Sequence, residues 1–123
     1  MDDHRFGKEV LDDLTPLHRE LRRAIPEVYK GFAELHRVSL GPGALDVKTK
    51  ELMALAIAVA EHCDGCIASH ARAAALAGAT RQEAAEAIGV AILMNGGPAT
   101  IYGPRAFAAF SDFADTRDTR ATA

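Results

Sequence analysis

Apolar side chains recur at intervals of three and four residues through much of this chain, which is the period of an amphipathic helix. The first third contains two such stripes, which predict two short helices within residues 9–40. Their apolar positions are Val10, Leu14, Leu17 and Leu21, then Val28, Phe32 and Leu35. Pro26 suits the first turn of the second helix, where a missing N–H costs nothing. The glycines and proline of the segment 40–43 then end this helical pair.

The middle of the chain predicts two helices that meet at a pair of cysteines. Asp46 is a suitable N-cap for a helix that runs to about His62. Its interior, residues 52–60, is apolar on every face, which predicts burial on all sides, in a core or between subunits. The segment 63–66 interrupts this pattern, and a second helix follows that is closed by Gly78.

The C-terminal part predicts two further helices. Thr80 and Glu83 have the spacing of a capping box, so a helix is expected from there to about residue 94. A last helix is expected over about 99–113, and the polar tail 115–123 is expected to fray. No segment alternates as a strand would. The sequence therefore predicts an all-α protein with five or six helices in a single domain, residues 1–123.

Composition narrows the class of protein. A length of 123 residues suits one compact domain. The formal net charge is −3 and no block of basic residues occurs, which argues against nucleic acid as the main partner. Alanine contributes 25 residues, whereas only five Phe and two Tyr represent the aromatic residues. A core of small side chains leaves little bulk to hold one chain together, and this favours an oligomer.

The segments that would direct a protein to a membrane or out of the cell are not expected here. The charged N-terminus has no apolar stretch behind it, so it does not resemble a secretory signal. The longest apolar run, 52–60, has nine residues, about half of a membrane span. We therefore expect a cytoplasmic protein without a membrane partner. Two cysteines in such a protein point to redox or metal chemistry.

The strongest local pattern for chemistry is Cys63, Cys66 and His70, preceded by Glu51. On a helix, Cys66 and His70 are neighbours across one turn, so the imidazole can hold or relay the thiol proton. Cys63 stands at or just before a helix start, where the helix dipole stabilises a thiolate. Glu51 could reach His70 or Cys66 if its helix folds back beside the second one. The pattern indicates an activated thiol with a resolving partner.

Each of these residues also has a simpler interpretation. Glu51 could be an exposed acid near a helix N-terminus, His70 an ordinary surface or core histidine, and the cysteines inert buried thiols. A zinc site is a further alternative, although the second, distant ligand pair of most structural zinc sites is absent. Its ligands would be Cys63, Cys66, His70 and either His62 or Glu51. A thioredoxin-like fold is not expected, because a long apolar helix precedes the cysteines.

The arrangement of Glu51, Cys63, Cys66 and His70 resembles the signature of the alkylhydroperoxidase D-like family, in the carboxymuconolactone decarboxylase superfamily. The stretch 51–83 and the later Gly-Gly-Pro at 96–98 are also similar to that family. The resemblance covers about residues 45–112. It implies an all-helical subunit that assembles into a homo-trimer or homo-hexamer, with the active site near subunit contacts.

The resemblance also implies a reaction. In the peroxidase branch of the family, a hydroperoxide oxidises the second cysteine, here Cys66, to a sulfenic acid. Cys63 then resolves it as a disulfide, Glu51 and His70 relay protons, and a dithiol reductant of the lipoyl type reduces the pair. We therefore expect a thiol-dependent peroxidase or disulfide reductase in antioxidant defence, with no cofactor and no metal.

One position departs from the family pattern, and two other functions stay open. Members often carry a histidine immediately before the second cysteine, where this chain has Gly65, so a simpler relay and a slower peroxidase are expected. The first alternative is a cofactor-free lyase of the decarboxylase branch, which does not need two cysteines. The second is a helical oligomer that binds a partner or ligand without turnover.

Overall fold

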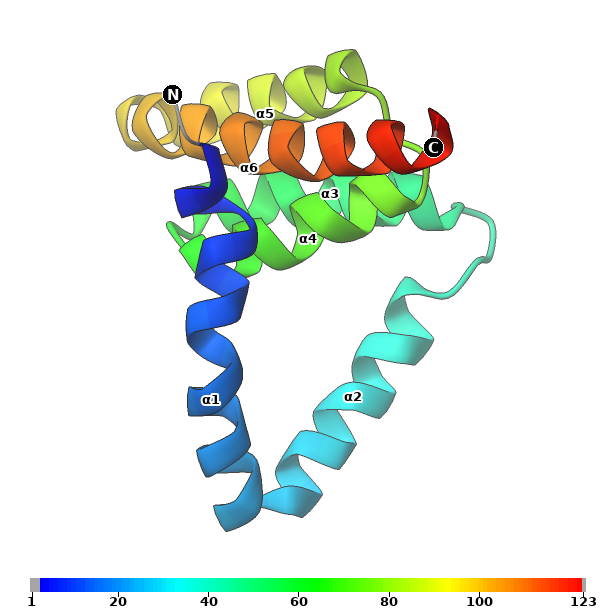
Figure 1. Cartoon of the computed structure of the whole chain (residues 1–123). Coiled ribbons are helices and arrows are strands. Elements are labelled where there is room, and N and C mark those ends of the chain that lie inside the picture. Colours follow the sequence, from blue (N-terminus) through cyan, green and yellow to red (C-terminus); the bar gives the residue numbers. More distant parts are fainter. Residues whose placement is uncertain (1–2, 123) are drawn as a thin grey trace.

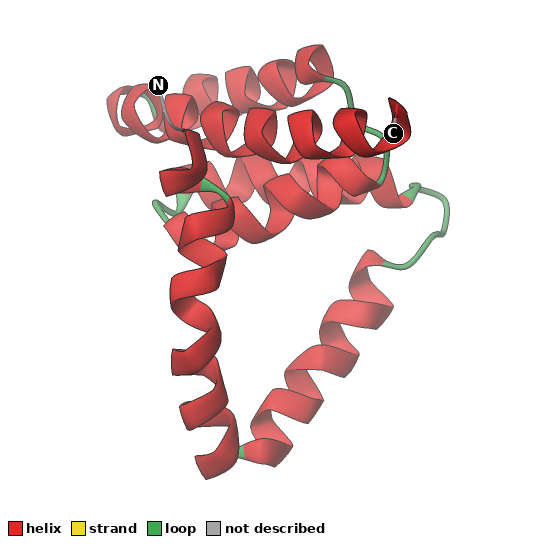
Figure 2. Ribbon diagram, viewed as in Figure 1, coloured by secondary structure: helices red, strands yellow, loops and turns green. Residues whose placement is uncertain are grey.

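A computed structural model describes residues 3–122, which form one short 3₁₀ helix and six α-helices (Figure 1). Figure 2 shows no strand among these residues, so the prediction of an all-α fold with five or six helices is confirmed. The elements are η1 (Asp3–Phe6), α1 (Lys8–Ala24), α2 (Pro26–Leu40), α3 (Val47–Ala60), α4 (Asp64–Leu76), α5 (Arg81–Asn95) and α6 (Gly97–Thr122). None of these helices is both long enough and apolar enough to cross a bilayer.

The predicted helix starts are confirmed in atomic detail. The Asp46 carboxylate accepts a hydrogen bond from the Thr49 backbone N–H at 2.8 Å and caps α3. At the start of α5 both bonds of the capping box are present. The Glu83 N–H donates to the Thr80 hydroxyl at 3.0 Å, and the Thr80 N–H donates to the Glu83 carboxylate at 2.9 Å. These bonds satisfy N–H groups that the helices themselves leave unpaired.

Helices α3, α4, α5 and α6 pack together as the body of the molecule (Figure 1). The buried apolar residues of the described chain are twelve alanines together with Leu55, Val59, Ile67, Ile88 and Phe110. Because alanine adds little bulk, the helix axes can approach closely. The small-residue core expected from composition is therefore the one observed.

Helices α1 and α2, which we call the arm (residues 8–40), extend away from the body as the two sides of a V (Figure 1). The predicted apolar stripes are present on both helices, yet no residue of either helix is buried. Leu17, Val28 and Phe32 remain 63%, 63% and 65% exposed. The stripes of the arm are thus apolar surfaces that this single chain leaves open.

Helix α3 is buried on one side and open on another. Leu55 and Val59 are fully buried, whereas Met53 and Ile57 are 50% and 59% exposed. The all-round apolar pattern of 52–60 predicts burial in a core or between subunits, and the core of one chain covers only part of this helix. The open side of α3 is a second apolar surface besides the arm.

The C-terminal helix is longer than the sequence predicts. It begins at Gly97 and continues through Gly103 and Pro104 without ending. The predicted end near residue 113 is too early, because α6 continues to Thr122; the last tail residue, 123, lies outside the described part.

Two aspartates of the last turns of α6 have a partner on α5. The Arg81 guanidinium pairs with Asp115, and it lies 3.5 Å from the Asp118 carboxylate. These contacts join the end of α6 to the start of α5. The polar sequence of the tail does not predict these contacts, because their partner Arg81 lies more than thirty residues earlier in the chain.

Candidate active site

The two cysteines lie where α3 turns into α4, and they are joined as a disulfide. Cys63 is the N-cap of α4, and its Sγ accepts a hydrogen bond from the Cys66 backbone N–H at 3.2 Å. His62, just before, adopts the left-handed conformation with φ of 57°, which reverses the chain between the two helices. The local sequence therefore places both sulfur atoms at the positive end of α4.

The predicted acid and histidine are in direct contact. His70 on α4 and Glu51 on α3 form a hydrogen bond of 2.7 Å between Nδ1 and Oε1. Glu51 is only 4% exposed, so the interpretation of an exposed surface acid is wrong. A buried carboxylate is costly without a hydrogen-bonded partner, and His70 is that partner.

This contact fixes the role of the imidazole atoms. A carboxylate only accepts hydrogen bonds, so Nδ1 of His70 donates to it, and Nε2 is then the nitrogen with the lone pair whenever the imidazole is neutral. The His70 side chain is 19% exposed, which leaves the ring partly open to solvent. Cys66 precedes it by one turn of the same helix and is the more exposed of the two cysteines. The four residues singled out from the sequence therefore form two contacting pairs, Cys63–Cys66 and Glu51–His70, on the neighbouring helices α3 and α4 and the turn between them.

A second histidine, which the sequence did not reveal, covers the first. The ring of His36, on α2, stacks on His70 with centroids 6.1 Å apart and planes 12° apart. Lys50 holds this end of α2 against the body through the carbonyl oxygens of Ser39 and Gly41, at 3.0 and 2.7 Å. No spacing within the motif could have found His36, because it lies on a separate helix far earlier in the chain.

An aromatic and ionic cluster supports the turn before Cys63. The His62 ring stacks on Tyr102 of α6 at 4.7 Å between centroids, with planes 13° apart. Arg105 lies over the same tyrosine ring at 4.6 Å and reaches the Asp64 carboxylate at 3.5 Å. These contacts fix the cysteine turn against α6. His62 therefore acts in positioning this turn, on the side of α4 that faces α6.

Helix α1 lies against the glycine between the cysteines. A Cβ atom built at Gly65 would stand 3.0 Å from Cδ1 of Leu14, closer than side chains normally approach. The position where family members often carry a histidine is thus adjacent to the arm.

Two further features of residues 3–122 bear on the site. They contain no group of three or more His, Cys, Asp or Glu side chains arranged to hold a metal ion. A cavity of about 450 Å³ is present, but it lies between α1, α4 and α6, and none of the four site residues lines it. The cysteine pair and His70 therefore lie at the surface of the body beside the arm, and all four site residues lie outside that cavity.

Comparison with known proteins shows the family to which this chain belongs. The model of the carboxymuconolactone decarboxylase family matches residues 26–111, and the chain belongs to this family. The match begins in α2, well before the stretch 45–112 that the motif suggested, and it includes the helix that carries His36.

Individual relatives share both sequence and structure with the chain. It is 40% identical to a carboxymuconolactone decarboxylase family protein from Legionella pneumophila, solved in the apo form. That comparison has a TM-score of 0.85 over 90% of this chain and 98% of that one. A Thermotoga maritima structure is 28% identical with a TM-score of 0.80, over 91% and 98% of the two chains. An uncharacterized protein of Cupriavidus necator is 35% identical over 79% of this chain and 88% of that protein.

Proposed function

We propose that this protein is a thiol-dependent peroxidase and disulfide reductase that uses Cys66 and Cys63. One observation carries the proposal: an exposed cysteine at a helix start, disulfide-bonded to its neighbour, stands one turn before a histidine that a buried glutamate holds. A thiol needs deprotonation to attack a peroxide, and the Glu51–His70 pair can take its proton.

In the first step the Cys66 thiolate attacks the terminal oxygen of a hydroperoxide. The O–O bond breaks, Cys66 becomes a sulfenic acid, and the alkoxide leaving group takes a proton to leave as an alcohol. His70 accepts the proton of the Cys66 thiol and can return it to the leaving oxygen, while Glu51 keeps the ring oriented. The buried carboxylate also stabilises the imidazolium that forms in between.

In the second step the Cys63 sulfur attacks the sulfenic sulfur of Cys66. An S–S bond forms, the S–O bond breaks and water leaves, which gives the disulfide present in the structure. A dithiol reductant, such as one of the lipoyl type, then exchanges with the disulfide, becomes oxidised itself and restores both thiols. A reducing cytoplasm would supply such a dithiol.

The N-terminal end of α4 serves each sulfur differently in this scheme. Cys63 receives the Cys66 N–H, which favours its thiolate as the resolving nucleophile. Cys66 has greater exposure and the base one turn away, which favours it as the group that meets the peroxide. The description of one Thermotoga maritima relative names an antioxidative response as a candidate role for that protein, which supports the same direction.

The test is hydroperoxide consumption with dihydrolipoamide as reductant, in the wild type, Cys66→Ser and Cys63→Ser. Both variants should lose turnover, and only Cys63→Ser should accumulate a sulfenic acid that a dimedone-type reagent traps. Ser69→Ala, a neighbouring change that spares both thiols, is the control. Equal rates in the wild type and Cys66→Ser would rule out the proposal, and trapping at Cys63 would reverse the order of the thiols.

A further inference from the structure

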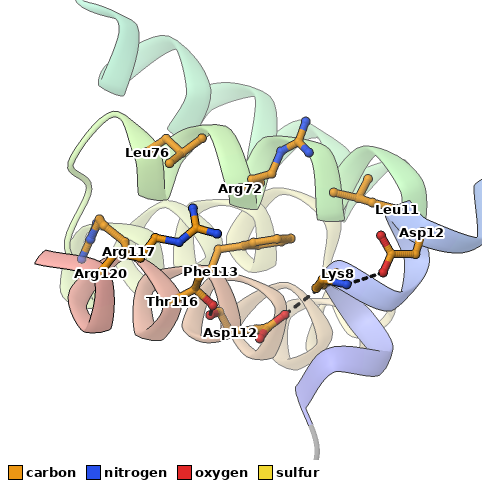
Figure 3. Close-up of a pocket in the computed structure, with 10 residues that line it drawn as sticks. All are labelled: Lys8, Leu11, Asp12, Arg72, Leu76, Asp112, Phe113, Thr116, Arg117 and Arg120. Atoms are coloured by element: carbon orange, nitrogen blue, oxygen red, sulfur yellow. Dashed lines mark hydrogen bonds and ion pairs between the residues drawn. The ribbon is translucent and has the colours of Figure 1, made fainter. Parts of the chain in front are cut away.

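Side chains of α1, α4 and α6 line a cavity (Figure 3), and none of the four residues of the cysteine site is among them. Both use α4, but from different sides of it. Arg72, which lines the cavity, follows His70 by two residues, and two residues on an α-helix turn the side chain by about 200°. The cavity volume of about 450 Å³ lies within the range of small-molecule sites.

Basic side chains from all three helices line this cavity, and two of them have no polar partner. Lys8 on α1 forms an ion pair with Asp12 at 2.5 Å. Arg117 on α6 donates at 2.8 Å to the carbonyl oxygens of Ala75, in α4, and Ala79, in the turn that follows α4. By contrast, Arg72 on α4 and Arg120 on α6 make no hydrogen bond or ion pair with any residue in the described part of the chain.

The acidic side chains of the cavity do not neutralise these two arginines. The buried Asp112 accepts the backbone N–H of Lys8 at 3.2 Å, and Asp12 is engaged by the Lys8 ammonium. Four cationic side chains thus line the cavity against two carboxylates. The two cations in excess, Arg72 and Arg120, make an anion the complementary ligand.

Apolar side chains form the remaining wall. Leu11 of α1, Leu76 of α4 and Phe113 of α6 line the cavity (Figure 3). Leu76 is 69% exposed, so an apolar group seated against it would remove its surface from water. Free guanidinium groups next to an apolar wall favour a ligand that has both a charged head and a hydrocarbon body.

We propose that this cavity binds a small organic carboxylate with an apolar body, that is, an acyl carboxylate. The guanidinium fork matches the two oxygens of a carboxylate, which makes arginine well suited to the head group. The wall of Leu76 and Phe113 receives the acyl chain. Arg117 is already held by the carbonyl oxygens of Ala75 and Ala79, so its side chain has a fixed position at the edge of the cavity.

The experiment is isothermal titration of the full-length protein with octanoate, acetate and octanol as separate probes. Octanoate should bind at least tenfold more tightly than either acetate or octanol, because only octanoate supplies both the head and the chain. Arg72→Gln with Arg120→Gln should weaken octanoate binding at least tenfold. Leu76→Ser should also weaken it, since this exposed side chain can change without disturbing the core. Arg23→Gln, which removes an exposed arginine of α1 outside the cavity, should leave binding unchanged.

Three results would overturn the proposal. The first is no heat of binding for octanoate in the wild type, and the second is equal binding by the wild type and the double arginine variant. The third is a combination of two findings. In sedimentation the double arginine variant forms a smaller assembly than the wild type, and octanoate binds only to dissociated chains. That result would mean that the cavity is a contact between copies of the chain. Each experiment measures binding or mass, so its result does not depend on whether the cysteines reduce peroxide.

Discussion

Glu51 is the residue whose interpretation differs most between the sequence and the structure. Two lysines, at 48 and 50, precede it, and an acid near the N-terminus of a helix is typically exposed. In the fold it is buried and bonded to His70, because α4 returns alongside α3 after the cysteine turn. Spacing along one helix could predict that Cys66 and His70 are neighbours. It could not predict a contact between two helices, which depends on the angle of that turn.

The first prediction concerns the charge of this buried acid. Glu51→Gln keeps an oxygen that can accept from Nδ1 of His70, but removes the charge that stabilises the imidazolium. We expect the rate of Cys66 oxidation by hydroperoxide to fall by about 10² or more, the usual contribution of general acid–base catalysis. The measurement is the second-order rate constant as a function of pH.

Glu61→Gln is the matched control, since Glu61 is exposed just after α3 and none of its side-chain contacts involves the site. It should react at the wild-type rate. If Glu51→Gln retained both the rate and the pH profile of the wild type, the acid would serve only to hold the two helices together.

His36 is a residue near the site that the sequence alone could not identify. Its ring covers His70, yet it belongs to a helix whose own period marks only apolar positions. The four motif residues could be found because chemistry constrains their spacing. A residue supplied by the arm has no such constraint, so only the fold reveals it.

At the scale of helices, predictions from the sequence are most accurate where a side chain hydrogen-bonds the backbone of a residue close to it in the chain. The caps by Asp46 and Thr80 are local interactions, and both were predicted correctly. The end of α6 was predicted wrongly for the opposite reason. Its last turns contact Arg81, which a view of the polar tail alone does not include.

The start of α5 leads to a prediction about pH. The Lys48 ammonium hydrogen-bonds the Glu83 carboxylate and lowers its pKa, and the Thr80 N–H adds to the effect. A carboxyl with a lower pKa in the folded state stabilises the fold above its unfolded pKa, and this contribution disappears as pH falls through the folded value. The free energy of unfolding should therefore decrease as the pH drops below about 4.

Urea denaturation across this range, in the wild type and Glu83→Gln, measures the effect. The variant should lose less stability on acidification than the wild type, because it has no carboxylate to protonate. Glu20→Gln, an exposed change in the middle of α1, should follow the wild-type curve. Parallel curves for Glu83→Gln and the wild type would contradict the assignment.

The end of α6 gives a prediction about local opening. Arg81→Gln removes the partner of Asp115 and Asp118, so the last two turns should open more often. Hydrogen exchange of the amides in residues 115–122 should become faster, with little change in α3 and α4. Unchanged protection of those amides would mean that packing alone holds the end of α6.

At the scale of the whole molecule, the dominant feature is apolar surface that one chain does not cover. The arm presents its stripe to solvent, and α3 presents Met53 and Ile57. The sequence predicts the amphipathic helices correctly, but periodicity does not say which molecule covers their apolar side. A core made largely of alanine leads to the same expectation of an oligomer, and the family resemblance implies that it is a homo-trimer or homo-hexamer.

We expect the arm to pack against other copies of this chain. Burying a side chain such as Phe32 contributes about 1.5–3 kcal/mol, so several per subunit suffice for a stable assembly. Phe32→Ser should lower the mass measured by sedimentation equilibrium at micromolar concentration. Lys30→Ser, an exposed change on the same helix, should not. A monomeric wild type at that concentration would show that the stripe has another role.

The contact between Gly65 and Leu14 also limits how this protein can change. A histidine at position 65 would have to displace the leucine, because even a Cβ atom meets it at 3.0 Å. The atom it meets is the end of a flexible side chain, so a small movement of Leu14, or its replacement by a shorter residue, would make the room. Positions 14 and 65 are therefore expected to change together when this family gains or loses that histidine.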